Sequence, residues 1–192
     1  RVELTAHGVD LPIYWGNRNW HPLLPDTLRQ MERDGVTRAV AVFTSAFSSY
    51  SGCRQYQENI AAAQAEVGHG APRVDKVRPF FHHPGFLHAV TERTREAVAA
   101  LPEDQRAGAH FLFTAHSIPN AMAATCAYEK QLAEASRLVA EAVGAGSFEL
   151  VYQSRSGPPQ VPWLGPDIVD HLPDVAARGV SAVVVVFSGY LS

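Results

Sequence analysis

Residues 110–153 read HFLFTAHSIPNAMAATCAYEKQLAEASRLVAEAVGAGSFELVYQ, and this stretch decides the fold class. It begins and ends with short extended apolar segments, His110–Thr114 and Phe148–Gln153. Between them, apolar side chains recur at helical spacing, at Leu132, Leu138, Val139 and Val143. A strand, a helix and a second strand in this order predict a βαβ unit, whose right-handed crossover makes the two strands parallel.

The same alternation continues on both sides of this stretch. Further strands are predicted at Leu11–Trp15, Arg38–Phe43, Lys76–Phe81 and Ser181–Phe187, and further helices over residues 24–31, 53–67, 86–101 and 168–175. Val183–Val186 has no polar alternation, so we expect a central strand that is buried on both faces. The fold class is therefore α/β, with two Rossmann-like half-domains whose parallel sheets are flanked by helices.

A polar break at Leu101–Gly108 separates the two half-domains, which we expect to cover residues 1–104 and 105–192. The first residue is Arg1 rather than Met, and helix-like sequence follows at once without a capping residue. After the last predicted strand, no helix follows that would cover it. We therefore expect an α/β fold that is truncated at both ends.

Composition excludes several classes of protein. Of the 192 residues, 46% are hydrophobic and 18% are charged, as in folded proteins. The net charge is −3 and no long basic run occurs, which argues against a nucleic-acid partner. The longest apolar run, Ala182–Phe187, is too short to span a bilayer. Two cysteines, Cys53 and Cys126, without a signal peptide indicate free thiols in a reducing, cytoplasmic compartment.

Ligands of open parallel sheets bind beyond the carboxyl ends of the strands. Four loops follow strands here, and we expect them to line one edge: residues 44–50, 115–119, 154–159 and 188–190. His116, two residues past the predicted strand end, is the main candidate in them. A neutral imidazole can accept protons near pH 7 or bind iron. The alternative is a loop histidine whose hydrogen bonds are satisfied by backbone.

Other chemistries find less support. Ser117 follows His116, but no G-x-S-x-G elbow occurs, which argues against a serine hydrolase. Gly144 and Gly146 lie between a helix and a strand, the reverse of the order that a dinucleotide loop needs, and no Walker motif occurs. A metal site at the densest histidine cluster is disfavoured because neighbouring side chains diverge: His82, His83 and His88. The remaining histidines are isolated and predicted to have no functional role: His7, His21, His69, His110 and His171.

All three tryptophans lie in two segments, Tyr14–Trp20 and Pro162–Leu164, with Arg18 and Arg155 nearby. Aromatic faces beside guanidinium groups suit a flat, acidic, conjugated ligand. Packing of the tryptophans in the core is the alternative.

Three ordered motifs, Thr114–Pro119, Tyr152–Pro158 with Trp163–Pro166, and Tyr14–Trp20, resemble the ferrochelatase family over nearly the whole chain. The segment Ser45–Tyr56 resembles its actinobacterial branch, which uses coproporphyrin III. The resemblance implies insertion of Fe²⁺ into this porphyrin in the cytosol, during haem synthesis. It also implies a chelatase-like fold of two similar half-domains with the macrocycle between them.

Residue by residue, the resemblance makes His116 the iron ligand or proton acceptor that faces the macrocycle. It implies porphyrin contacts from Tyr56, with Tyr50 as the competing tyrosine. Arg54, Ser117 and Ser154 are predicted as further porphyrin-binding residues. Beyond Gly189-Tyr190-Leu191-Ser192 the family continues into an Asp-His-x-Glu motif, so we expect the partner glutamate outside this chain and the chain alone to be inactive.

Cys126 lies ten residues after His116, where some relatives in this branch carry a ligand of a [2Fe–2S] cluster. The resemblance implies such a cluster only for a longer protein, since a single thiolate cannot hold it. Otherwise no cofactor is expected besides the substrate Fe²⁺, and the protein is expected to be a monomer. The alternatives are a non-catalytic porphyrin or haem carrier, a protoporphyrin IX ferrochelatase, and an unrelated chelatase for sirohydrochlorin or cobalt tetrapyrroles.

Overall fold

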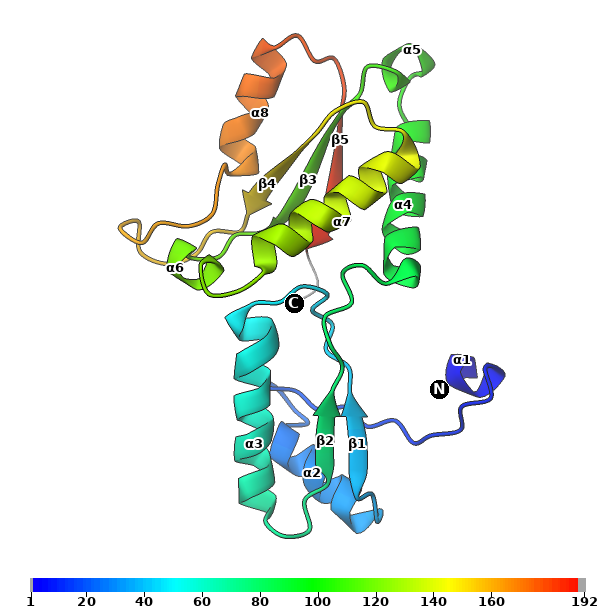
Figure 1. Ribbon diagram of the computed structural model, residues 1–192, viewed down its shortest axis with the longest axis vertical. Helices are drawn as coiled ribbons and strands as arrows, with labels where there is room; N and C mark the ends of the chain where they lie inside the picture. Colours follow the sequence, from blue (N-terminus) through cyan, green and yellow to red (C-terminus); the bar gives the residue numbers. More distant parts are fainter. Residues whose placement is uncertain (1, 190–192) are drawn as a thin grey trace. The chain divides into compact units, whose positions relative to one another are not determined.

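The structure is a computed structural model that describes residues 2–189 (Figure 1). The predicted match at Tyr190, Leu191 and Ser192 lies outside the described residues. Contacts divide the chain into a first unit, Arg1–Phe43 with Cys53–Val77, and a second unit, Thr44–Gly52 with Arg78–Ser192. Each unit contains one small parallel sheet with helices against it, which confirms the predicted α/β class.

The sheet of the first unit has two strands, β1 (Arg38–Ala41) and β2 (Arg73–Lys76). They run parallel, with Arg38 opposite Arg73. Helices α1 (Val2–Ala6), α2 (Leu24–Arg33) and α3 (Gln55–Val67) complete the unit, preceded at α3 by a π-helical turn, η1 (Tyr50–Arg54). Helices α2 and α3 pack on each other, and α3 buries Ile60 and Ala63, one turn apart.

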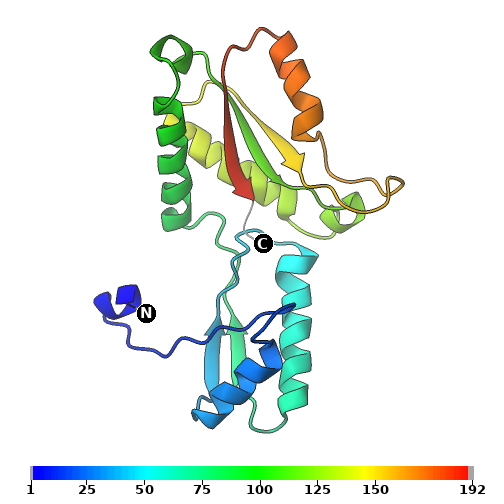
Figure 2. The same cartoon turned by 180° about the vertical axis from the view of Figure 1, so that it is seen from behind.

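The sheet of the second unit has three parallel strands in the order β4-β3-β5. These are β3 (His110–His116), β4 (Phe148–Gln153) and β5 (Val183–Gly189). The helices are α4 (Pro84–Ala99), α5 (Glu103–Arg106), α6 (Asn120–Ala123), α7 (Tyr128–Val143) and α8 (Ile168–Ala177). Figure 2 shows α8 and α7 on opposite sides of this sheet.

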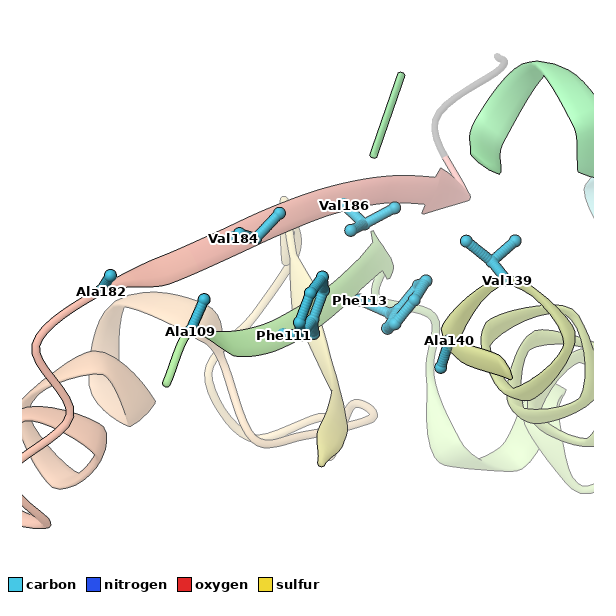
Figure 3. Packing of buried hydrophobic residues seen from close by; sticks show 8 residues of the cluster. All are labelled: Ala109, Phe111, Phe113, Val139, Ala140, Ala182, Val184 and Val186. Atoms are coloured by element: carbon cyan, nitrogen blue, oxygen red, sulfur yellow. The ribbon is translucent and has the colours of Figure 1, made fainter. Parts of the chain in front are cut away.

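Alternation along β3 explains these layers. Phe111 and Phe113 pack with Val139 and Ala140 of α7, in a cluster that Val184 and Val186 of β5 complete (Figure 3). Leu112, between the two phenylalanines, instead packs with Val151 of β4 and Val175 of α8. Successive side chains of a strand point to opposite faces, so β3 packs on both faces and is buried from His110 to Ala115, whereas His116 at its end is half-buried.

The sequence misplaced three strands. Leu11–Trp15 forms no strand, and the segment predicted at Lys76–Phe81 is a strand only up to Lys76. Both predictions contain a proline, Pro12 or Pro79, whose missing N–H cannot join a ladder. Val183–Val186 lies at an edge of the described sheet, because β3 takes the centre.

Helix α4 packs against α7 and β5, within the second unit. These contacts place residues 84–99 with the second sheet, whereas the predicted half-domain 1–104 includes them. The boundary at residues 104 and 105 concerns half-domains of a longer protein, and it stays a prediction.

Candidate functional site

His116 is the last residue of β3 and lies opposite Gln153, the last residue of β4. The pairing of β3 with β5 shifts register between Thr114 and Ala115, just before this histidine. Such irregularities bend a strand and re-aim the side chains near its end. The imidazole is half-buried, and among residues 2–189 no hydrogen bond or ion pair of its ring is present. Both ring nitrogens are thus available to a ligand.

Two of the predicted motifs meet directly after His116. Ser117 N donates to Gln153 O at 2.7 Å, and Ser117 Oγ donates to the carbonyl of Leu164 at 2.7 Å. Leu164 N in turn donates to Ile118 O at 3.0 Å. The loops after β3 and β4 therefore form one hydrogen-bonded platform, in which the side chain of Ser117 is 1% exposed.

Ser154, directly after β4, is exposed and has a φ of 60°. Left-handed backbone is uncommon for any residue except glycine and costs roughly 1–2 kcal/mol. Arg155 braces the same loop, since its Nη2 donates to Pro159 O at 2.9 Å. Trp163 is half-buried, and its indole Nε1 is buried with no hydrogen-bond partner in the described part of the chain. The segment after β4 therefore holds a strained hydroxyl residue, Ser154, and an unsatisfied buried donor, Trp163 Nε1.

The Ser45–Gly52 segment is joined to α7. Ser48 donates from both N and Oγ to Gln131 Oε1, at 2.7 and 2.9 Å. A Cβ added at Gly52 would lie 2.6 Å from Ser45 Oγ, so a larger residue there would force the Ser45 side chain to move. The first part of the segment that resembles the coproporphyrin-using branch thus lies with His116 in the second unit.

Tyr56 belongs to the first unit and lies in a stack of aromatic and cationic side chains. Its ring centroid is 4.4 Å from that of Phe43, and Arg18 Cζ lies 5.0 Å from the centroid of the Tyr56 ring. Lys76 Nζ lies 5.4 Å from the Phe43 ring, at the other end. All four side chains are half-buried. Two cations beside two rings form a surface suited to an aromatic ligand with carboxylates.

Arg54, the residue directly before α3, is exposed and forms an ion pair with Glu58 at 3.0 Å. It therefore stands outside the stack around Tyr56. Tyr50, the competing tyrosine, is 41% exposed. Tyr56 and Arg54 belong to the first unit, whereas His116, Ser117 and Ser154 belong to the second.

The two cysteines are free thiols in different units. Cys126 Sγ donates weakly to Ala123 O at 3.7 Å, and Lys76 Nζ lies 3.8 Å from Cys53 Sγ. Two cysteines do not fit the four ligands of a [2Fe–2S] cluster. Between residues 2 and 189, no three His, Cys, Asp or Glu side chains are grouped so that they could hold a metal ion.

The clustered histidines have structural contacts. His83 caps α4, since its Nδ1 accepts from Gly85 N at 3.1 Å. His82 packs its ring against Phe81, with centroids 4.5 Å apart. Within the described residues, no helix has the length and apolar character needed to cross a membrane.

Sequence reasoning missed a charged cluster at the amino end of the second sheet. Glu149 of β4 hydrogen-bonds His171 of α8 and Arg178 directly after this helix, and its Oε1 lies 3.2 Å from Nε2 of the buried His110. The hydrogen bond from Arg178, with a smaller contribution from His171, lowers the pKa of Glu149 to about 2, although partial burial acts to raise it. The two histidines predicted to be isolated thus share one carboxylate. The separations of 39 positions from His110 to Glu149 and 22 positions from Glu149 to His171 give no signal of this in the sequence.

Comparisons with known proteins agree with these motifs. The ferrochelatase family matches residues 1–192. The coproporphyrin III ferrochelatase of Nocardia farcinica is 52% identical over 198 residues, covering 99% of this chain and 56% of that relative. A ferrochelatase of Rhodopirellula baltica is 54% identical over 191 residues, with 99% and 54% covered. The chain spans about half the length of these curated relatives, and it belongs to the ferrochelatase family.

Proposed function

We propose that the protein represented by this chain inserts Fe²⁺ into coproporphyrin III, with His116 acting on the iron and the pyrrole protons. The half-buried imidazole at the end of β3, without a partner among residues 2–189, carries this proposal. It lies where parallel sheets bind ligands, on a platform built from two family motifs.

The chemistry needs a proton acceptor because a free-base porphyrin carries two pyrrole N–H protons. Fe²⁺ takes the place of these two protons, which leave the macrocycle as the metal enters. A neutral imidazole can take up a proton near pH 7. A carboxylate from outside the described residues would complete the site, as the resemblance implies.

The substrate side rests on charge. Coproporphyrin carries four propionates, and the side chains of Arg18 and Lys76 at the ends of the Tyr56–Phe43 stack would pair with carboxylates. Arg54, Ser117 and Ser154 remain proposed porphyrin contacts. For Ser117 the contact requires its 1% exposed hydroxyl to leave Leu164 O, so its contribution would be through the backbone loop.

For the whole protein we further propose a cytoplasmic monomer, with half-domains at residues 1–104 and 105–192 of this numbering. Cys126 would hold a [2Fe–2S] cluster only if three more cysteines came from outside this chain. No step of the proposed reaction depends on such a cluster.

A chimaera tests the proposal. The chain replaces the matched span of the Nocardia farcinica relative, and anaerobic iron insertion is followed as loss of porphyrin fluorescence. We expect turnover with a higher kcat/KM for coproporphyrin III than for protoporphyrin IX. A preference for protoporphyrin IX would contradict the coproporphyrin assignment. Both substrates are compared because the name of the Rhodopirellula baltica relative, a ferrochelatase, specifies no porphyrin.

A non-catalytic porphyrin carrier is the second candidate function, because the stack around Tyr56 would bind a porphyrin without any chemistry at His116. Binding and turnover separate the two. A chimaera that quenches porphyrin fluorescence stoichiometrically, but shows no multiple turnover with excess Fe²⁺, would support the carrier.

A further inference from the structure

We infer that Tyr128, the first residue of α7, is a positioning residue for His116: its hydroxyl fixes the peptide from which the imidazole projects. The inference rests on the proposed function, in which that imidazole does the chemistry. Neither the sequence motifs nor the comparisons assign any role to Tyr128.

The contact is a single hydrogen bond in a buried setting. Tyr128 Oη donates to the carbonyl oxygen of His116 at 2.9 Å. The tyrosine is 6% exposed and belongs to the cluster around Ala115 and Leu132. Phe47 packs edge-on against its ring, with centroids 6.2 Å apart. The ring therefore has little freedom to turn its hydroxyl elsewhere.

The neighbouring amide of the same peptide unit is also held. Ser117 N donates to Gln153 O at 2.7 Å, so the peptide between His116 and Ser117 is anchored from β4 at its N–H and from α7 at its C=O. Two anchors in different elements fix the plane of this peptide and with it the direction of the His116 Cα–Cβ bond. A catalytic group must be held to within a fraction of an ångström for efficient reaction.

Burial keeps the anchor in its donor form. Desolvation raises the pKa of Tyr128 far above the physiological range, with smaller contributions from Tyr152 and Cys126. The phenol therefore stays protonated, and keeps its donor, at physiological pH. Any pH dependence of turnover would come from other groups.

Tyr128→Phe removes only the hydroxyl and is the test, with Tyr152→Phe as the matched control. Tyr152 is 3% exposed in the same cluster, but the hydroxyl that bonds His116 O is that of Tyr128. His116–Ser117 is the only His–Ser pair in the sequence. Labelling histidine carbonyls with ¹³C and serine amides with ¹⁵N thus gives one NMR cross-peak for this peptide in the 192-residue chain.

We expect Tyr128→Phe to shift the His116 carbonyl resonance in the direction of a lost hydrogen bond, and Tyr152→Phe to leave it in place. An unshifted carbonyl in a folded Tyr128→Phe chain would overturn the inference. A spectrum that shows global unfolding is resolved by 4-aminophenylalanine at position 128, which keeps a donor and should restore the resonance if the bond is what matters.

The functional arm uses the chimaera described above. Tyr128→Phe should lower kcat about five-fold, the equivalent of roughly 1 kcal/mol for one hydrogen bond, and leave KM for the porphyrin unchanged. An equal loss in Tyr152→Phe, or a change confined to KM, would show a general packing effect and refute positioning. If the unsubstituted chimaera does not turn over, the proposed function fails, while the carbonyl shift still tests the bond itself.

Discussion

His116 stands at the end of a strand whose six preceding residues are all buried, so its backbone is fixed while the residue itself is half-buried. In the chimaera, His116→Ala should lower kcat at least a hundred-fold and change porphyrin affinity little, because the ring acts on metal and protons rather than on the macrocycle rim. Steady-state iron insertion and fluorescence titration measure the two effects. Near-parental kcat in His116→Ala would refute the assignment.

The control for this variant is His82→Ala. That ring packs against Phe81, and His82 belongs to none of the four loops predicted to line the site, at residues 44–50, 115–119, 154–159 and 188–190. Turnover should stay within a few-fold. A comparable loss in both variants would point to a damaged fold rather than to lost chemistry.

Ser154 combines a predicted porphyrin contact with a left-handed backbone at φ 60°. Ser154→Gly should raise the free energy of unfolding by about 1 kcal/mol, because glycine adopts this conformation without strain. Porphyrin binding should weaken at the same time if the strain serves to present the hydroxyl. Denaturant titration and porphyrin titration on the same variant decide this, and tighter binding would contradict it.

At the scale of elements, Glu149 connects β4 with α8 through His171 and Arg178. The folded state lowers the pKa of this carboxyl to about 2, so it contributes stability above its unfolded pKa of about 4.5 that is lost as pH falls towards 2. Glu149→Gln should reduce the free energy of unfolding at pH 7 by about 1–3 kcal/mol and flatten this acid dependence.

Glu134→Gln is the matched control, since Glu134 pairs with Arg137 on the exposed face of α7. Exposed pairs contribute about 0–1 kcal/mol, so its loss should be small. Denaturant titrations at pH 7 and pH 3 compare the two variants. Equal losses would mean that α8 does not depend on this cluster.

The elements also show what a sequence can and cannot predict. Helices, and strands such as β4, predicted and found at Phe148–Gln153, follow from apolar spacing. The strand at Leu11–Trp15 was wrong because apolar content outweighed Pro12 in the prediction. The predicted position of β5 at the centre of the sheet was wrong for a different reason. Periodicity indicates that a strand is buried but does not indicate which strands lie next to it, and β3 lies at the centre of the described sheet.

For the candidate site, the residues His116, Ser117 and Ser154 were predicted at strand ends, and the structure places them at the ends of β3 and β4, while their roles stay predictions. The stack of Arg18 on Tyr56 and the bond from Tyr128 to His116 were not predicted, because each joins residues on different elements. Local spacing carries no information about such contacts. The resemblance to the family motifs pointed to the candidate residues, whereas their contact partners are seen only in the folded structure.

At the scale of the molecule, the chain covers 54% to 57% of the first relatives. The 192-residue chain alone should therefore show little or no iron insertion, while the chimaera turns over. Porphyrin fluorescence assays on both at equal concentration measure the difference. Turnover by the chain at the rate of the chimaera would show that the remaining residues of the relatives are dispensable.

The second unit is not one continuous piece of chain. Thr44–Gly52 belongs to it although the residues on either side belong to the first unit, and this segment supplies Ala46 and Phe47 to the cluster around Tyr128. A fragment cut at residue 78 would lose both apolar side chains and the edge-on support of Tyr128. Dissection of this protein by limited proteolysis or gene splitting therefore needs residues 44–52 returned as a graft or as a complementing peptide.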